Sequence, residues 1–330
     1  MHQGGRITDR VVGPTSHYYY SQRLKLHYVD WGNSEKPPML LVHGGRDHAR
    51  NWDWVAQQLR DAYHIIAPDL RGHGDSEWAR GGRYALIDYV LDISQLLEQL
   101  QLFPITIIGH SLGGAISCQY SGIYPDRVKQ LVAIEGLGPP PDKLRRGPAY
   151  LRMQKWITQM RMFAGRHPRR YPSLNTAIQR MQEANKHLSA EQARHLTIHG
   201  SYRNEDGTYT WKFDNYVRSR SPYEFNMEEA RSIWERITCP TLLLRGTESW
   251  ASDPIKDGRA SAFQHARCVN IKRAGHWVHH DQLEEFLKVV QAFLKETALS
   301  TPSLISSSWT YVPAGNLPEK TVRRYVCPGS

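Results

Sequence analysis

The segment Gly109-His110-Ser111-Leu112-Gly113-Gly114 places one serine among glycines. It follows a buried apolar run and precedes a helical pattern, which is the strand–turn–helix context of a nucleophilic serine on a sharp turn. Side chains at positions 109 and 113 would clash with neighbouring backbone, and the following helix directs its amide dipoles toward developing negative charge. The pattern predicts Ser111 as a nucleophile, the alternative being a glycine-rich turn without chemistry.

A second glycine pair, in His43-Gly44-Gly45, ends the apolar run of residues 38–43. A loop in this position can donate one backbone amide to an oxyanion, while the residue after the nucleophile donates the other. We therefore predict that the amides of Gly45 and Leu112 form the oxyanion hole, where each donor would contribute roughly 3 to 4 kcal/mol. An ordinary glycine turn is the alternative.

The candidate general base is His276, in Gly275-His276-Trp277 between the last apolar run and the last helical pattern. A base in this position can reach the nucleophile across the end of a sheet. His279 and His280 follow closely, which raises the question of a metal site, but no other His/Asp cluster in the sequence completes one. We interpret His279 and His280 as packing and helix-start residues and predict neither a metal ion nor an organic cofactor.

A carboxylate must hold the tautomer of the histidine and stabilise its imidazolium. Three candidates stay open. Glu135 directly follows the apolar run of residues 128–134, Glu248 lies in the loop after residues 241–244, and Asp253 precedes a proline and is equally explained as a helix N-cap. Glu135 is favoured narrowly over Glu248, and Asp253 comes last.

Short apolar runs alternate with amphipathic helical patterns in both outer parts of the chain. Such alternation is typical of parallel βαβ units in an α/β sheet. Strands are predicted at residues 24–31, 38–43, 64–68, 105–108, 128–134, 241–244 and 268–271, and helices at 52–60, 85–102, 112–124, 254–263 and 283–295.

The alternation breaks at about Gly136, and the following hundred residues read as a helical cap at residues 137–236. Between residues 142 and 236 there are 18 Lys/Arg and 10 Asp/Glu, a local charge of +8 that fits either an anionic substrate or a solvated helical surface. Aromatic and Met side chains there could line an apolar pocket or form the core of the cap itself. The candidates for substrate binding are Trp156, Met160, Phe163, Trp211 and Phe213, with Met162, Tyr216 and Phe225 beside them.

Taken together, these motifs resemble the α/β-hydrolase superfamily over about residues 18–297. The matching segments are HGG at 43–45, RGHGDS at 71–76, GHSLGG at 109–114 and AGHW at 274–277. Within the superfamily, the chain is similar to the branch of esterases, haloalkane dehalogenases and epoxide hydrolases that carries a helical cap after the sixth strand. The dehalogenases and epoxide hydrolases use Asp where this chain has Ser111, which disfavours their chemistry.

The resemblance implies a mostly parallel, eight-stranded sheet flanked by helices. Its two parts would be residues 18–136 and 237–298, with the cap between them, and we expect a poorly ordered tail at residues 299–330. Many relatives place the acid at the position of Ser249, and this chain departs from that pattern. Some relatives carry the acid at the position of Glu135 instead.

We therefore predict a serine hydrolase that cleaves a small-to-medium carboxylic ester through an acyl-enzyme. The alternatives are a C–C bond hydrolase acting on a diketone-like acid and a non-catalytic binding protein of the same fold. The net charge is +10, but no basic run interleaves with aromatic residues, so a nucleic-acid partner is not expected. No apolar run of about 20 residues predicts a membrane span, and without a secretory signal the expected location is cytoplasmic. The four cysteines are expected to be reduced: Cys118, Cys239, Cys268 and Cys327.

Overall fold

The computed structural model describes residues 13–298, apart from residues 83, 141–143, 145, 146, 220 and 224. The predicted poorly ordered tail at residues 299–330, which contains Cys327, lies outside the described residues. No disulfide joins the three cysteines that are described, as the sequence predicted. None of the described helices is both long enough and apolar enough to cross a bilayer.

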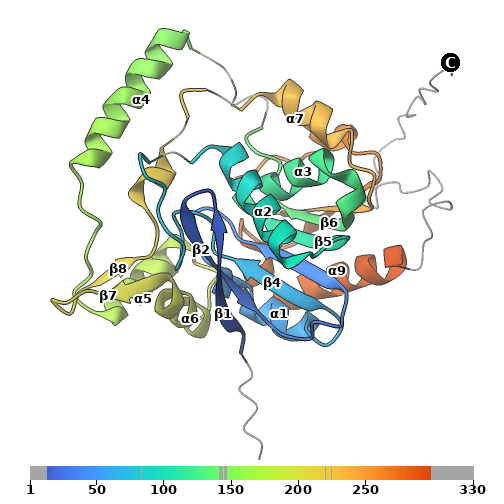
Figure 1. Cartoon of the computed structure of the whole chain (residues 1–330), viewed down its shortest axis with the longest axis horizontal. Helices are drawn as coiled ribbons and strands as arrows, with labels where there is room; N and C mark the ends of the chain where they lie inside the picture. Colours follow the sequence, from blue (N-terminus) through green and yellow to red (C-terminus); the bar gives the residue numbers. More distant parts are fainter. Residues whose placement is uncertain are drawn as a thin grey trace, which may run out of the picture.

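An eight-stranded sheet forms the centre of the molecule (Figure 1). Its strand order is β1-β2-β4-β3-β5-β6-β9-β10, with β2 antiparallel to both of its neighbours and parallel pairing from β4 to β10. The predicted α/β fold is therefore confirmed, and the first strand is an addition that the sequence pattern did not reveal. The strands are β1 (Thr15–Ser21), β2 (Leu24–Asp30), β3 (Pro38–Val42), β4 (His64–Pro68), β5 (Ile105–His110), β6 (Val128–Ile134), β9 (Thr241–Gly246) and β10 (Ala266–Ile271).

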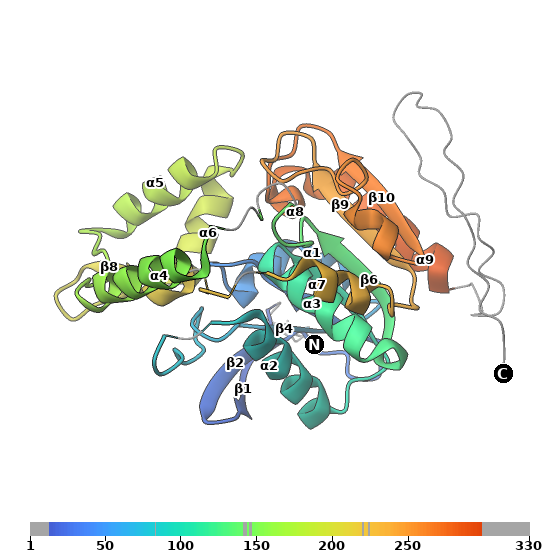
Figure 2. The same cartoon turned by 90° about the horizontal axis from the view of Figure 1, so that it is seen from above.

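Helices cover both faces of the sheet because each of these helices has one apolar face to bury. On one face, α2 (Leu86–Leu100), α3 (Leu112–Ile123) and α7 (Met227–Trp234) share one apolar core with the sheet. On the other face, α1 (Asp53–Leu59), α8 (Val278–Asp281) and α9 (Leu283–Ala298) share a second (Figure 2). Short 3₁₀ turns η1 (Ala49–Trp52), η2 (Pro125–Arg127) and η5 (Arg259–Ala262) connect these elements, and η5 is all that forms of the helix predicted at residues 254–263.

The strand register brings the loops that carry chemistry to one edge of the sheet. The end of β5 pairs with the end of β6, His110 opposite Ile134, and Ile134 in turn lies opposite Leu244 of β9. The carboxyl ends of parallel strands meet at one edge, which is where open α/β sheets place their ligands. The residues directly after β5, β6 and β9 are therefore neighbours in space.

We call residues 137–236, between β6 and β9, the inserted segment. It holds α4 (Ala149–Ala164), α5 (Leu174–Ala184), α6 (Ala190–Gly200) and the 3₁₀ turn η4 (Asn215–Arg218), together with the short hairpin of β7 (Ser201–Arg203) and β8 (Tyr209–Trp211). The hairpin departs from the purely helical character that the sequence suggested. Figure 1 shows α4, α5, α6 and the hairpin beside the sheet, whereas α7 packs on α3 as part of the helical layer.

Candidate active site

Ser111 occupies the turn between β5 and α3. Its backbone has φ 51° and ψ −113°, a conformation with positive φ that L-residues rarely adopt. The turn is held because the Ser111 amide donates to the Ile134 carbonyl at 2.8 Å and the Ala115 amide donates to the Ser111 carbonyl at 3.0 Å. Ser111 thus stands on a constrained strand–turn–helix junction, as the glycine pattern predicted.

The glycines around Ser111 are required by close packing of the backbone. A Cβ at Gly109 would lie 2.5 Å from the Gly113 carbonyl oxygen, and a Cβ at Gly113 would lie 2.2 Å from the Val42 carbonyl oxygen. Both distances are far below van der Waals contact, so a side chain at either position would displace β3 or α3. The predicted steric role of positions 109 and 113 is confirmed.

The loop after β3 lies against this turn. A Cβ on Gly44 would be 3.3 Å from Cβ of Ser111, and one on Gly45 would be 4.0 Å from Cδ2 of Leu112. His43 fixes the loop because its Nε2 accepts the Leu70 amide at 2.9 Å. Its other nitrogen therefore carries the proton and donates to the Gly44 carbonyl at 2.7 Å, and burial lowers the pKa of His43 to about 3. Among the described residues, the amides of Gly45 and Leu112 have no hydrogen-bond acceptor.

His276 forms its decisive contact with Glu135. Nδ1 of His276 lies 2.7 Å from Oε2 of Glu135, whose side chain is fully buried. Glu135 directly follows β6 and has a positive φ of 52°, and its amide donates to the Leu244 carbonyl at 2.9 Å. Of the three carboxylates left open by the sequence, the structure brings Glu135 to the histidine.

Two further donors hold the Glu135 carboxylate from the loop after β9. The Gly246 amide donates to Oε1 at 2.8 Å, and the Ser249 hydroxyl donates to Oε2, the same oxygen that accepts from His276. Sequence reasoning noted Ser249 only as a departure from the pattern of the family. The serine in place of the usual acid was the signal in the sequence that another element supplies the carboxylate.

Glu248 and Asp253 lie elsewhere. The Glu248 side chain is about half exposed and pairs with His187 at 3.6 Å. Asp253 accepts the Ile255 amide at 2.9 Å within a turn. No helix begins there, so its alternative role as a helix N-cap is wrong. The expectation that Glu248 could complete a triad with His276 therefore finds no contact in the structure, because the backbone turn after β9 points its side chain toward His187.

Aromatic rings enclose His276. Nε2 of His110 lies 2.9 Å from the His276 carbonyl oxygen, and the centroids of the two rings are 4.8 Å apart. Burial and the nearby His276 keep the pKa of His110 well below its usual value, so His110 is neutral and Nε2 must be the donor. Trp250 packs on the His276 ring at 4.7 Å. These contacts fix the plane of the imidazole, although the sequence motif identified only His276 itself.

The Ser111 hydroxyl makes no hydrogen bond among the described residues. Hydrogen bonds between nucleophile and base are often long in ligand-free sites and shorten when substrate binds. His276 offers Nε2 for this contact because Glu135 occupies Nδ1. The segments that carry the two residues are joined through the bond between His110 and the His276 carbonyl.

A cavity of about 520 Å³ lies between the inserted segment and the loop at residues 78–82. Met160 and Phe163, both predicted to bind substrate, line it together with Tyr216, while Arg80 and Arg166 add positive charge. Neither Ser111 nor His276 is among the described residues that line it. The cavity is therefore separate from the reacting groups, and it is assigned no catalytic role.

The other predicted pocket residues have structural partners within the described part of the chain. Trp211 donates to the Tyr171 hydroxyl at 3.0 Å, and the Arg218 guanidinium lies over the Phe213 ring in a cation–π contact. Trp156 on α4 is only partly buried and does not line the cavity. The structure brings Met160 and Phe163 together and leaves Trp156, Trp211 and Phe213 apart from them.

Comparison with known proteins gives the same fold. The family model described as "alpha/beta hydrolase fold" matches residues 37–283, which is most of the chain. The chain belongs to the α/β-hydrolase family. Membership in this family supports hydrolase activity, and the order of strand, serine, acid and histidine along the chain is consistent with it.

Individual α/β-hydrolases resemble the chain at low identity over most of its length. An esterase of Mycobacterium tuberculosis is 26% identical over 289 residues, covering 86% of this chain and 91% of the esterase. Mouse epoxide hydrolase 4 is 26% identical over 287 residues, covering 83% of this chain and 77% of that protein. The crystal structure of a hypothetical protein from Pseudomonas aeruginosa PAO1 superposes with a TM-score of 0.75 at 24% identity, covering 85% of this chain and 99% of that one.

Proposed function

We propose that this α/β-hydrolase is a serine hydrolase that cleaves a small-to-medium carboxylic ester through a covalent acyl-enzyme. Ser111 is the nucleophile, His276 the general base and Glu135 the acid. The observation that carries the proposal is the 2.7 Å contact between His276 Nδ1 and buried Glu135, next to a serine held on a constrained turn. The relatives named as esterases support the same reaction class.

The first step is attack by the Ser111 hydroxyl on the ester carbonyl carbon. His276 Nε2 accepts the hydroxyl proton, and the imidazolium that forms is stabilised by the Glu135 carboxylate at its Nδ1–H. The Gly246 amide and the Ser249 hydroxyl hold that carboxylate in place. Because these donors are preorganised, no rearrangement is needed as charge develops.

The negative charge on the carbonyl oxygen would be accepted by the amides of Gly45 and Leu112. Both amides lie beside the Ser111 turn and lack an acceptor among the described residues. Leu112 also begins α3, so the positive end of that helix dipole faces the same point. Collapse of the tetrahedral intermediate releases the alcohol, which takes its proton from His276, and water activated by His276 then hydrolyses the acyl-enzyme.

A C–C bond hydrolase acting on a diketone-like acid is the second candidate, using the same serine and histidine. The local charge of +8 between residues 142 and 236 is compatible with it, because a basic segment would suit a carboxylate substrate. The two candidates differ in the bond that breaks, while the nucleophile is common to both. Product analysis therefore separates them.

The test is hydrolysis of p-nitrophenyl acetate, butyrate and octanoate by the wild type and by Ser111→Ala, together with labelling by a fluorophosphonate probe. Ser232→Ala, which changes an exposed serine on α7, is the matched control. We expect turnover and labelling in the wild type and the control, and neither in Ser111→Ala. Labelling of Ser111 without ester turnover would favour C–C hydrolysis, and the absence of both would leave a binding protein of this fold.

A further inference from the structure

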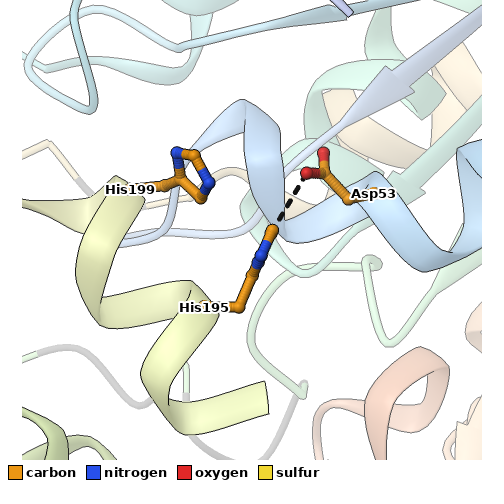
Figure 3. Close-up of side chains that lie close together, drawn as sticks. All are labelled: Asp53, His195 and His199. Atoms are coloured by element: carbon orange, nitrogen blue, oxygen red, sulfur yellow. Dashed lines mark ion pairs between the residues drawn. The ribbon is translucent and has the colours of Figure 1, made fainter. Parts of the chain in front are cut away.

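A cluster of three metal-binding side chains lies outside the candidate active site, where the inserted segment meets the core (Figure 3). His195 and His199 are one turn apart on α6, and Asp53 is the first residue of α1. One ligand atom from each of the three lies within 4.8 Å of the others. The i and i+4 spacing on one helix places both imidazoles on the same face, toward α1.

We propose that Asp53, His195 and His199 bind one divalent transition-metal ion of the zinc type. Two imidazoles and one carboxylate are a ligand set that suits zinc and its neighbours, whereas calcium and magnesium prefer oxygen ligands alone. The backbone carbonyl of Arg50, 3.2 Å from Nε2 of His195, lies at the same place and can supply a fourth donor. The site is independent of the proposed hydrolase reaction.

The side chains of the group already face one another. Nε2 of His195 lies 3.1 Å from Oδ2 of Asp53, across the contact between α6 and α1 (Figure 3). His199 forms no hydrogen bond among the described residues, although its ring lies 4.6 Å from that of His195.

Arg50 is the group that the metal must displace. Its guanidinium binds the Asp53 carboxylate through Nε at 2.8 and 3.0 Å and through Nη2 at 2.6 Å. The Arg50 side chain is 29% exposed, so it can turn into solvent when a cation of higher charge takes its place. Arg50 and the metal therefore compete for the same carboxylate.

A second group of similar composition, His27 with Asp69 and Asp75, shows why the Asp53 group is preferred. Asp69 already accepts from His27 at 2.7 Å, from the Ala49 amide at 2.6 Å and from the Asp75 amide at 2.9 Å. Two of these donors are backbone amides, which cannot turn away from the carboxylate as the partly exposed Arg50 side chain can turn away from Asp53. Lys212 also pairs with Asp75 at 2.7 Å. That group reads as a structural network.

Binding would join α6 of the inserted segment to the segment that follows the Gly44–Gly45 loop. The two already touch, because His48 Nε2 lies 3.0 Å from the Leu196 carbonyl oxygen. An ion that binds only the folded chain stabilises it, and the effect grows with the logarithm of the ion concentration above its Kd. Zinc should therefore raise the melting temperature by about 2 °C at a tenfold excess over its Kd.

The test is titration of the tag-free, full-length chain with Zn²⁺ by calorimetry and with Co²⁺ by visible absorption. We expect one equivalent to bind, with affinity at least tenfold weaker in His199→Ala. His199→Ala removes no hydrogen bond among the described residues, so it should leave the metal-free fold intact. Arg50→Gln should bind about tenfold more tightly, because the competing cation is gone, and His167→Ala, an exposed histidine of the same segment, should match the wild type.

Zinc binding of unchanged affinity in the His195→Ala/His199→Ala double variant would overturn the proposal, as would the absence of any binding to the wild type. Circular dichroism of each variant without metal confirms that it is folded. Should Asp53→Asn bind as tightly as the wild type, the carboxylate would not be a ligand and the site as proposed would be wrong.

Discussion

Two helices of equal length differ in how much of their apolar surface they bury. The 16-residue helix α9 buries Phe286, Val290, Phe293 and Leu294 against the sheet. The 16-residue helix α4 in the inserted segment buries only Phe163. Trp156 and Met160 are partly buried, and five other large apolar side chains of α4 are exposed: Tyr150, Leu151, Met153, Ile157 and Met162. Figure 1 shows α4 away from both helical layers of the sheet.

This difference indicates which parts of the molecule can position reacting side chains precisely. Elements packed on both faces of a sheet have one arrangement, because dense packing leaves no alternative. Ser111, Glu135 and His276 all project from loops anchored directly to such elements, through β5, β6 and the start of α8. Helix α4 of the inserted segment buries only Phe163, so this part of the segment is suited to selecting ligands and unsuited to positioning reacting atoms.

The largest expected effect is that of Glu135→Gln. A glutamine amide at this position would place its NH₂ group opposite the Gly246 amide, or opposite both the Ser249 hydroxyl and Nδ1 of His276. The first arrangement sets two donors against each other, and the second forces the wrong tautomer of the histidine. We expect kcat/KM to fall by about 10³–10⁴-fold, which is about 4–5.5 kcal/mol of transition-state stabilisation. The measurement is ester hydrolysis at pH 7.5 with initial rates over a range of substrate concentrations.

Two control variants accompany it. Glu248→Gln changes the exposed candidate acid, and Trp156→Ala changes a predicted pocket residue of the inserted segment. We expect Glu248→Gln to stay within about twofold of the wild type and Trp156→Ala to act on KM more than on kcat. If Glu248→Gln lost more activity than Glu135→Gln, the assignment of the acid would be wrong.

The next effect compares the two helices directly. Phe286→Ala removes a fully buried ring, and we expect the free energy of unfolding to fall by about 3–5 kcal/mol. Ile157→Ala on α4 removes a side chain that is 42% exposed, and we expect a change below about 0.5 kcal/mol. Urea unfolding of both variants is the measurement. A loss above about 1.5 kcal/mol for Ile157→Ala would mean that α4 is packed against other groups in solution.

The strands and helices of the core could be predicted from the sequence because their periodicity and turn residues are local patterns. Strand and helix periodicity gave β3 to β6 and α2, α3 and α9 to within a few residues, and the glycines at 109 and 113 identified the turn. The choice between Glu135 and Glu248 required knowing where β6 and β9 lie side by side. That register depends on pairing between residues more than a hundred positions apart, which no local pattern contains.

The cap residues show a second limit of sequence reasoning. An aromatic or Met side chain has the same pattern whether it lines a pocket or packs on a neighbour. Met160 and Phe163 line a cavity, whereas Trp211 packs on Tyr171. The sequence pattern could not distinguish these residues, because which of them faces the cavity depends on how the chain folds between α4 and β8.

Histidines buried in the core should also make the stability of the folded chain depend on pH. Burial lowers the pKa of His43 to about 3, of His73 to about 4 and of His280 to about 3. Below the unfolded value near 6.5, the unfolded chain binds protons that the folded chain does not, so stability falls as pH falls from about 6.5 toward these values. Each such histidine contributes about 1.4 kcal/mol per pH unit in that window.

His280→Leu tests this dependence, because Nε2 of His280 is buried without a partner in the described part of the chain. The free energy of unfolding measured between pH 6.5 and 5 should lose less per pH unit in this variant, by about 1.4 kcal/mol. His167→Leu, in an exposed position of the inserted segment, should keep the slope of the wild type. Equal slopes for all three proteins would contradict the assigned role of the buried histidine.

The smallest effect, and the sharpest test of how the core positions its acid, is that of Ser249→Ala. The Ser249 hydroxyl donates to the same Glu135 oxygen that His276 contacts, so its loss removes one of three hydrogen bonds to the carboxylate and leaves the charge in place. We expect kcat to fall about tenfold with KM nearly unchanged, which is about 1.4 kcal/mol and the typical scale of a hydrogen bond to a charged group.

The pattern of variants at this position separates positioning from packing. Ser249→Thr keeps the hydroxyl and should restore most of kcat, whereas a role in packing alone would make the larger side chain worse than alanine. An unchanged kcat in Ser249→Ala would mean that the Gly246 amide and His276 alone hold the carboxylate.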